Sequence, residues 1–350
     1  MKIHQKYILR GIELGKKGLG TTAPNPMVGC VIVHEGKIIG EGYTSPYGGP
    51  HAEVNAIRSV QDKSLLAKAT LYVTLEPCSH YGKTPPCADL IVQHAIPEVV
   101  IGIKDPHDKV AGKGIQKLEA AGCKVTVGVL EEECRVHLKR FLTFQEKKRP
   151  YIILKWAETQ DGFIAPDPKL RKSNPEPFWI TNPYSKQMVH QWRSQEQAIL
   201  VGTQTVLEDN PKLTTRDWAG KNPVRVVLDR DLKIPKGFHV LDPTVKTLVL
   251  TQVHDATRYL EGIVYETVDF SKTIATQICT VLHQHAITSM IIEGGSRTLQ
   301  TFIDENLWDE ARVFTGTSVF GSGVPAPKLH GKPISEQSIL TDTLSIFTND

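Results

Sequence analysis

The sequence predicts two α/β domains in tandem. Its 350 residues exceed the length at which a single hydrophobic core usually stops growing, so we expect two cores. Short apolar segments alternate with amphipathic segments along nearly the whole chain, which is typical of strands alternating with helices. A basic segment that ends in a proline, residues 143–150, separates two such series. We therefore expect the first domain at residues 1–146 and the second at residues 147–350.

In the first domain, residues 4–19 carry apolar side chains at helical spacing and end in glycines, which predicts a helix. A loop with two prolines follows at 21–26, where Asn25 offers both a donor and an acceptor to the edge of a base. Residues 28–33 and 37–43 then indicate a β-hairpin. Further strands are expected at 70–75, 99–103 and 124–127, and helices at 87–94 and 114–121. Together these elements predict a three-layer α/β domain.

Four residues of this domain have the chemistry of a catalytic zinc site. Zinc binds imidazole nitrogen and thiolate sulfur, and a catalytic site uses three protein ligands and leaves the fourth position to water. His51, Cys78 and Cys87 are the expected ligands, and zinc lowers the pKa of a bound water towards ~7. Glu53 lies two residues after His51, where one helical turn would aim its carboxylate at that water, and we expect it to carry the proton.

The eight residues between Cys78 and Cys87 leave one alternative open. His80 lies in this loop and is a candidate fourth ligand, which would make the site a closed structural zinc. His80 and Lys83 also suit contact with a phosphate or a sugar hydroxyl. The other cysteines have no partner at ligand spacing, so we expect them to be core residues.

The second domain is expected to contain strands at 151–156, 198–201, 224–228, 247–250, 290–292 and 311–314, with helices between them. It lacks the usual glycine-rich dinucleotide fingerprint. Instead, an apolar strand runs into Glu293, two glycines and the start of a helix. Backbone N–H groups at such a helix start can hold a phosphate, although the signal is also that of an ordinary strand–helix turn.

Composition excludes several classes of protein. The formal net charge is +3, and basic residues are interspersed with acidic ones, so no nucleic-acid groove is indicated. No stretch approaches the length of a membrane span or of a signal-peptide core. Six cysteines in a chain of this length do not indicate a disulfide framework. A cytoplasmic protein is expected.

The first domain resembles the zinc-dependent nucleobase deaminases through His51, Glu53 and the Pro–Cys pair at 77–78. Residues 25–29, 51–53 and 77–87 are most similar to the deaminase half of the bifunctional riboflavin-biosynthesis deaminase/reductase family. The resemblance implies a cytidine-deaminase-like fold and hydrolytic deamination of 2,5-diamino-6-(5-phosphoribosylamino)pyrimidin-4-one. It also implies that the substrate is held by Asn25, His80, Lys83 and Asp105. Thr44 and His107 differ from the usual family pattern.

The second domain resembles the reductase half of the same family, which implies a dihydrofolate-reductase-like fold. Residues 155–162, 179–181, 202–211, 213–216 and 293–295 carry this resemblance. It implies NADPH as cofactor and reduction of the ribosyl chain to ribityl. The implied cofactor contacts are Ala157, Trp179, Thr205, Asp209, Gly295, Ser296, Arg297, Thr298 and Leu299, and the implied substrate contacts are Arg193, Leu213, Arg216 and Glu293. Two arginines also suit a phosphate because guanidinium groups bind its oxygens bidentately.

The whole chain is thus expected to be one enzyme that uses Zn²⁺ and NADPH on small phosphoribosylaminopyrimidine substrates. We further expect a homo-oligomer, either a dimer or a tetramer, with no nucleic-acid or membrane partner. Two rival functions remain open at this point. One is a deaminase with a degenerate reductase domain, and the other is a nucleic-acid deaminase, which would not need the second domain.

Overall fold

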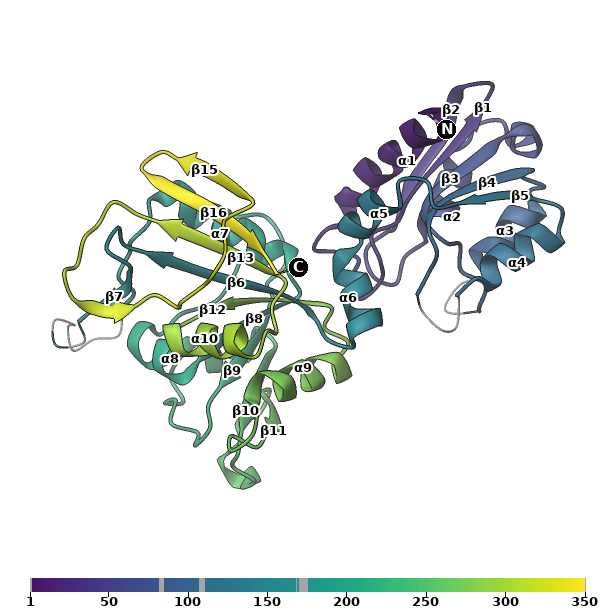
Figure 1. The fold of residues 1–350 in the computed structure, drawn as a ribbon. Coiled ribbons are helices and arrows are strands. Elements are labelled where there is room, and N and C mark those ends of the chain that lie inside the picture. Colours follow the sequence, from purple (N-terminus) through teal and green to yellow (C-terminus); the bar gives the residue numbers. More distant parts are fainter. Residues whose placement is uncertain (1, 82–84, 107–110, 168, 170–175, 350) are drawn as a thin grey trace. The chain divides into compact units, whose positions relative to one another are not determined.

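The computed structural model describes residues 2–81, 85–106, 111–167, 169 and 176–349. The chain divides into two compact units, Met1–Lys148 (unit 1) and Arg149–Asp350 (unit 2). Figure 1 shows both units with their helices and strands labelled. Within the described residues, no helix has the length and apolar character needed to cross a membrane.

Unit 1 is built on a five-stranded sheet with the strand order β2-β1-β3-β4-β5. The strands are β1 (Gly29–His34), β2 (Lys37–Tyr43), β3 (Thr70–Leu75), β4 (Glu98–Ile103) and β5 (Lys124–Val127). Strands β1 and β2 form the expected antiparallel hairpin, β3 is antiparallel to β1, and β3, β4 and β5 are parallel to one another. The central strands are buried nearly throughout, as expected of strands that are covered on both faces.

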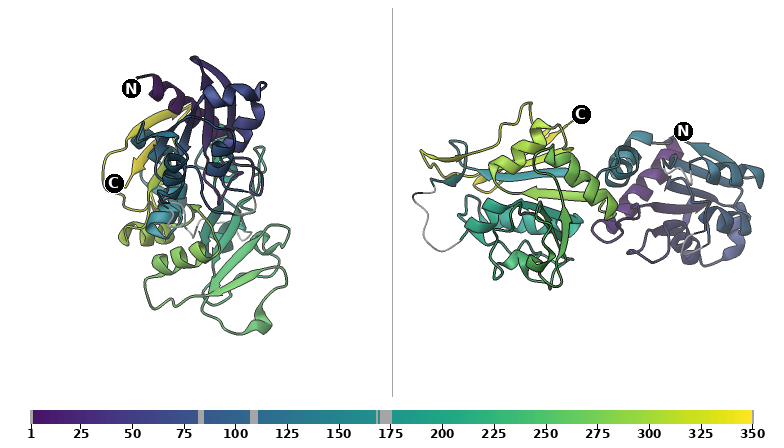
Figure 2. Two further views of the ribbon diagram at one scale, coloured as in Figure 1. Left: turned by 90° about the vertical axis from the view of Figure 1, so that its right-hand side faces the viewer. Right: turned by 90° about the horizontal axis from the view of Figure 1, so that it is seen from below.

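Two helices pack on opposite faces of this sheet where glycines allow a close approach. A side chain at Gly29 would collide with the backbone of Gly11 in α1 (Lys2–Gly15), and one at Gly42 would collide with α2 (Ala52–Ser59). Because Gly42 pairs with Cys30, the residue after Gly29, the two glycines face opposite sides of the sheet. The other helices of the unit are α3 (Cys87–Gln93), α4 (Lys113–Ala120), α5 (Glu131–His137) and α6 (Lys139–Lys147). Figure 2 shows the resulting three-layer arrangement from two further sides.

The segment expected to connect the domains is mostly helical. Residues 143–147 form the end of α6, and Leu142 and Thr143 are buried in unit 1. The short apolar stretch before this segment packs on the core of unit 1. The helix that contains it continues into the basic residues that follow. The compact units meet at Lys148 and Arg149, two residues after the expected boundary.

Unit 2 contains a nine-stranded sheet with the order β11-β10-β9-β8-β12-β6-β13-β16-β15. Seven neighbouring strands are parallel: β6 (Tyr151–Glu158), β8 (Ala198–Gly202), β9 (Val224–Leu228), β10 (Thr247–Thr251), β11 (Val264–Thr267), β12 (Ser289–Glu293) and β13 (Glu310–Thr315). Antiparallel β16 (Asp342–Thr348) and β15 (Ser335–Ile339) complete one edge. A separate two-stranded arm pairs β7 (Phe163–Pro166) with β14 (Gly323–Pro325).

Two hydrophobic cores lie on the two faces of the large sheet. In β6, Ile152 and Leu154 point into one core and Ile153 into the other, as the alternation of a strand requires. The first core includes side chains of α9 (Ile274–Gln284) and α10 (Ser296–Asp304), and the second includes side chains of α7 (Pro183–Gln195) and α8 (Thr203–Asp209). This double coverage explains why the central strands are apolar at almost every position.

The apolar patterns of the sequence predicted the six central strands of unit 2 but not five other strands of the described residues. Strands β7, β11, β14, β15 and β16 were not expected. Strand β15 is almost entirely exposed and polar, and β14 has three residues, so neither has an apolar pattern to reveal it. The partners of these strands, not their own sequences, determine that they form.

Candidate active sites

In unit 1, the start of α2, the end of β3 and the start of α3 lie close together. They bring His51, Cys78 and Cys87 to one place. His51 immediately precedes α2, Cys78 follows the end of β3 by three residues, and Cys87 is the first residue of α3. The His51 Nδ1 atom lies 3.6 Å from Cys78 Sγ and 3.4 Å from Cys87 Sγ. All three potential ligand atoms lie within 4.8 Å of one another.

These distances fit a zinc ion. With Zn–S bonds of about 2.3 Å and Zn–N bonds of about 2.05 Å, a tetrahedral site places nitrogen and sulfur ligands roughly 3.5 Å apart. Both observed N–S distances are close to that value. Among the described residues, this is the group of His, Cys, Asp and Glu side chains suited to a metal ion, and His80 does not belong to it. Three ligands leave one position for water, which is the arrangement of a catalytic site.

The surroundings of Cys78 favour its thiolate form. The backbone N–H of Cys87, at the start of α3, donates to Cys78 Sγ at 3.3 Å. Hydrogen bonds from Cys87 and from His51 lower the pKa of the Cys78 thiol. A thiolate is the form that binds a metal, so the local structure favours the ligand form of Cys78.

Glu53 is a buried acid beside these ligands. It lies in the first turn of α2 and is 4% exposed. Burial, followed by the nearby Cys78, raises the pKa of Glu53 to about 7. A carboxyl group with a pKa near neutrality can both accept and release a proton, which is what a general acid–base residue needs.

The residues expected to hold the deaminase substrate are only partly described. Asn25 is half-buried in the loop before β1, and His80 is exposed. Asp105 is buried just after β4, whereas Lys83 lies outside the described residues, as does His107. Thr44 is buried and accepts a hydrogen bond from the Val28 backbone N–H at 3.1 Å, so this departure from the family pattern has a structural role.

Glu76, which was not among the predicted site residues, binds backbone groups at and after Asp105. Its buried carboxylate accepts backbone N–H groups from Asp105 at 3.2 Å, Gly112 at 2.9 Å and Gly114 at 3.0 Å. It also accepts from Ile115 at 3.3 Å. Glu76 lies two residues before Cys78, so one side chain connects the end of β3, the end of β4 and the start of α4. No sequence pattern indicated this role, because the partners lie 29 to 39 residues away.

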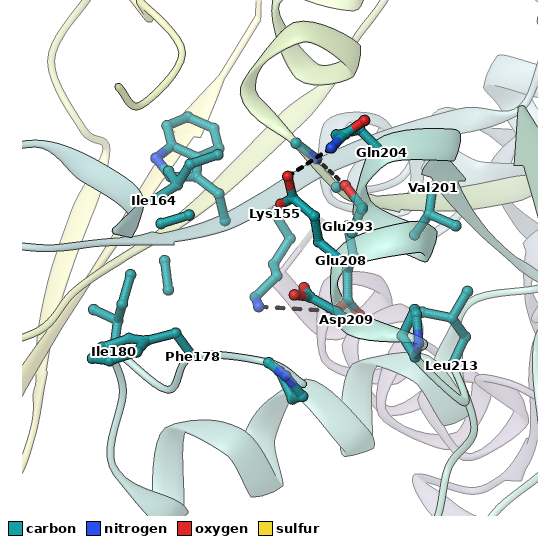
Figure 3. Close-up of a pocket in the computed structure, with 18 of the residues that line it drawn as sticks. Lys155, Ile164, Phe178, Ile180, Val201, Gln204, Glu208, Asp209, Leu213 and Glu293 are labelled. Atoms are coloured by element: carbon teal, nitrogen blue, oxygen red, sulfur yellow. Dashed lines mark hydrogen bonds and ion pairs between the residues drawn. The ribbon is translucent and has the colours of Figure 1, made fainter. Parts of the chain in front are cut away.

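Unit 2 contains a cavity of about 780 Å³ at the ends of β6, β8 and β12, shown in Figure 3. Most residues implied as cofactor contacts line it: Ala157, Trp179, Thr205, Asp209, Gly295, Ser296 and Arg297. All four implied substrate contacts line it as well: Arg193, Leu213, Arg216 and Glu293. The structure therefore gathers residues that are up to 140 positions apart in the sequence, from Ala157 to Arg297.

Thr298 and Leu299 are not among the residues that line this cavity. Leu299 has no exposed surface and belongs to the core packed under α10. The Thr298 hydroxyl lies beside Gly202, at the end of β8, where any side chain would collide with it. In the helix that starts at Ser296, Leu299 therefore points into the core, whereas Thr298 is half-buried against the end of β8.

The strand–turn–helix at the end of β12 is held against α8. The Gly295 backbone N–H donates to the Thr205 hydroxyl at 2.8 Å, and Gly295 immediately precedes α10. Ser296 and Arg297 are the first residues of that helix and line the cavity. The cavity is therefore bounded by a helix N-terminus, where backbone N–H groups favour a phosphate.

A buried ion cluster lies at the base of the cavity. Arg193 from α7 makes two hydrogen bonds to Glu293, at 2.8 and 2.7 Å, and Lys155 Nζ lies 3.9 Å from the same carboxylate. Burial tends to raise the pKa of Glu293, but the charges of Arg193 and Lys155 outweigh this effect and lower the pKa to about 2. Glu293 is therefore ionised at neutral pH. Lys155 was not singled out in the sequence, although it belongs to the first strand of the reductase resemblance.

The structural elements thus define a two-part protein: a metal-binding domain of the deaminase type and an α/β domain with a cofactor-sized cavity. Residues 1–103 match the family of the cytidine and deoxycytidylate deaminase zinc-binding region, and residues 150–343 match the RibD C-terminal domain. The protein therefore belongs to the class in which a zinc-binding deaminase domain is followed by a reductase domain.

Full-length relatives establish the family. The chain is 39% identical to the riboflavin biosynthesis protein RibD of Aquifex aeolicus over 338 residues, covering 96% of this chain and 93% of the relative. It is 39% identical to that of Bacillus amyloliquefaciens over 334 residues, covering 93% of this chain and 88% of the relative. A solved diaminohydroxyphosphoribosylaminopyrimidine deaminase/5-amino-6-(5-phosphoribosylamino)uracil reductase from Thermotoga maritima is 39% identical, with a TM-score of 0.88 over 99% of both chains. This chain belongs to the RibD family of bifunctional deaminase/reductases in riboflavin biosynthesis, which confirms the expected resemblance and fold class.

Proposed function

We propose that this chain catalyses two consecutive reactions on phosphoribosylaminopyrimidines, those named for its solved relative from Thermotoga maritima. In unit 1, water would replace the 2-amino group of 2,5-diamino-6-(5-phosphoribosylamino)pyrimidin-4-one, and ammonia would leave. In unit 2, NADPH would reduce the ribosyl chain of the deaminated product to ribityl. The observation that carries the proposal is the three-ligand metal group with a buried, titratable Glu53 beside it.

In the deamination, Glu53 takes one proton from the attacking water and delivers it to the ring nitrogen. It then takes the remaining proton from the added hydroxyl group and delivers it to the leaving amine, which departs as ammonia. Zinc bound by His51, Cys78 and Cys87 would act as a Lewis acid that makes the attacking water more acidic. Burial of Glu53 supports this role because its pKa of about 7 allows proton transfer in both directions. Asn25, His80, Lys83 and Asp105 are proposed to hold the pyrimidine and its phosphoribosyl group.

In the reduction, NADPH bound in the cavity would supply hydride to C1′ of the open-chain imine, and a proton would be added to the imine nitrogen. The cavity next to the start of α10 is large enough for a cofactor, and Thr205, Trp179 and Asp209 line it. Arg193, Leu213, Arg216 and Glu293 are the proposed substrate contacts. Lys155 and Arg193 supply positive charge at the base of the cavity, which suits an anionic substrate.

Exchanging Glu53 for Gln tests whether the two reactions use separate sites. Gln is nearly isosteric and is not needed to bind the metal, so zinc content should match the wild type. Deamination should fall by at least ~10²–10⁴-fold, since Glu53 acts more than once per turnover. NADPH oxidation with the already deaminated substrate should be unchanged, because the reductase residues lie in the other unit. Near-normal ammonia release, or an equal fall of both activities, would contradict the proposal.

The cofactor is tested separately on the segment Arg149–Asp350, which forms a compact unit with its own cores. Calorimetry should detect NADPH binding to this segment without zinc. A folded segment that binds no NADPH at millimolar concentration would favour a deaminase whose reductase half is inactive.

A further inference from the structure

We propose that His190 and Asp217 position Arg216 for the phosphate of the reductase substrate. The proposal concerns a contact between α7 and residues 213–217, here called the arginine segment. It rests on the proposed function, in which Arg216 binds the phosphoribosyl group. None of the sequence patterns pointed to His190 or Asp217.

His190 is a buried histidine that lies close to one carboxylate, that of Asp217. It lies in α7 and is 2% exposed, and its Nε2 atom is 3.1 Å from Asp217 Oδ2. Its Nδ1 atom is buried and has no hydrogen-bond partner within the described part of the chain. The proton of a neutral imidazole therefore belongs on Nε2, where an acceptor is available. Burial, together with Arg193 and Arg216, lowers the pKa of His190, which agrees with a neutral donor.

Asp217 connects this donor to Arg216. The oxygen that lies 3.1 Å from His190 Nε2, Asp217 Oδ2, is 4.0 Å from Arg216 Nε. Arg216 lines the reductase cavity, whereas Asp217 and His190 do not. Nε is the guanidinium nitrogen that pairs with Asp217, so the two terminal nitrogens would remain for a ligand. That pair is the face with which arginine binds phosphate bidentately.

The exposure of the three side chains explains why a buried residue, His190, is needed to hold Asp217 and Arg216 in place. The side chains of Arg216 and Asp217 are 40% and 52% exposed, and exposed ion pairs of this kind contribute little by themselves because the side chains are mobile. The His190 side chain is only 3% exposed and is fixed by the packing of α7. A buried donor thus restricts Asp217 to one position, and Asp217 in turn restricts Arg216. Less conformational freedom is then lost when a phosphate binds.

A second contact fixes the other end of the arginine segment. Arg193, one turn after His190 on α7, donates from Nη1 to the Thr214 carbonyl oxygen at 3.3 Å. Leu213 is buried and has a φ of 54°, a left-handed conformation that a leucine adopts only when its surroundings impose it. Helix α7 therefore holds the segment on both sides of Arg216, through Thr214 and Asp217.

The test is a double-mutant cycle between the anchor and Arg216, in the full-length enzyme. The probes are the phosphoribosyl substrate of the reductase and the same compound with its phosphate removed. Arg216→Ala should raise the KM of the phosphorylated substrate roughly ten- to hundredfold, since a bond between two charged groups is lost. Asp217→Ala and His190→Leu should each raise it about three- to tenfold. In the Arg216→Ala background, Asp217→Ala should add less than about twofold.

Three further readouts separate positioning from a general structural role. The KM for NADPH and the KM for the dephosphorylated substrate should stay within about twofold in Asp217→Ala. His190→Gln keeps a donor near the position of Nε2 and should restore most of the affinity that His190→Leu loses. Asp269→Ala is the matched control, because Asp269 is similarly exposed, pairs with Lys272 at 3.2 Å and does not line the cavity.

The possible outcomes distinguish an error in the proposed phosphate contact of Arg216 from an error in the positioning role of His190 and Asp217. If Arg216→Ala leaves the KM of the phosphorylated substrate unchanged, the proposed contact of Arg216 with phosphate is wrong. If that variant weakens binding but Asp217→Ala and His190→Leu do not, the positioning role is overturned and the proposed function stands. Equal losses for both substrates, or a full additional loss in the Arg216→Ala background, would also overturn it. If His190→Leu does not fold, Asp217→Ala tests the same contact from its exposed end.

Discussion

Glu293→Gln should destabilise unit 2 by an amount that the structure allows us to estimate. The Glu293 carboxylate pairs with Arg193 and Lys155, and its side chain is only 10% exposed. These charges lower its pKa from the ordinary 4.5 to about 2. Because one pKa unit corresponds to about 1.4 kcal/mol, the ionised carboxylate contributes about 3 kcal/mol to the free energy of unfolding. Breaking a buried pair typically costs about 3–5 kcal/mol, which agrees with this figure.

The pH dependence follows from the direction of the shift. A carboxyl group whose pKa is lower in the folded state stabilises the fold above its unfolded pKa, about 4.5, and loses that contribution as pH falls towards 2. The stability difference between wild type and Glu293→Gln should therefore be constant from pH 7 to pH 5.5 and should narrow below pH 4.5. In a unit of this size, about 3 kcal/mol corresponds to a fall in Tm of roughly 6–12 °C.

Calorimetry of the full-length enzyme at pH 7 and pH 4 measures both quantities, with NADPH binding used to identify the transition of unit 2. Glu266→Gln is the matched control, because Glu266 pairs with His285 at 2.7 Å but is 33% exposed. That change should cost less than about 1 kcal/mol. A loss below about 1 kcal/mol in Glu293→Gln, or a difference that widens as pH falls, would refute the reasoning.

Three other substitutions test the remaining contacts. Cys87→Ser should lose both zinc, measured by metal analysis, and ammonia release; full zinc content with full deamination would show that another residue is the third ligand. Glu76→Gln should raise the KM of the deaminase substrate several-fold and lower the stability of unit 1 by about 2–4 kcal/mol, since four backbone donors lose a charged acceptor; an unchanged KM would show that Glu76 only stabilises the fold. Gly29→Ala should destabilise unit 1 by more than about 3 kcal/mol in chemical denaturation, because its Cβ would lie 1.8 Å from the Gly11 carbonyl oxygen; a wild-type midpoint would contradict the close packing of α1 on β1.

The candidate metal group of His51, Cys78 and Cys87 was predictable because its residues lie in short, recognisable sequence motifs. His51 and Glu53 lie within one helical turn, and Cys78 follows an apolar strand directly, so the sequence shows both the residue types and the elements that carry them. The six central strands of unit 2 were predictable for a similar reason. They are buried on both faces and therefore apolar at almost every position.

The implied contacts of the reductase cavity came from resemblance rather than from any local pattern. Their side chains approach one another only where parallel strands end at the same edge of the sheet. No spacing in the sequence predicts these contacts. The same applies to the edge strand β15, whose mostly polar residues pair with β16, which itself pairs with β13.

By itself, then, the sequence determined the α/β class and pointed to the candidate metal-binding group and the acid beside it, because each depends on neighbours within a few residues or on uniform burial. Only the tertiary structure decided how Glu76 connects two strand ends, how Glu293 is shared between Arg193 and Lys155, and how α7 holds the arginine segment. In each of these cases one polar side chain meets partners that lie 21 or more residues away. Such contacts satisfy buried charges and donors, and the chain reveals them only when it folds.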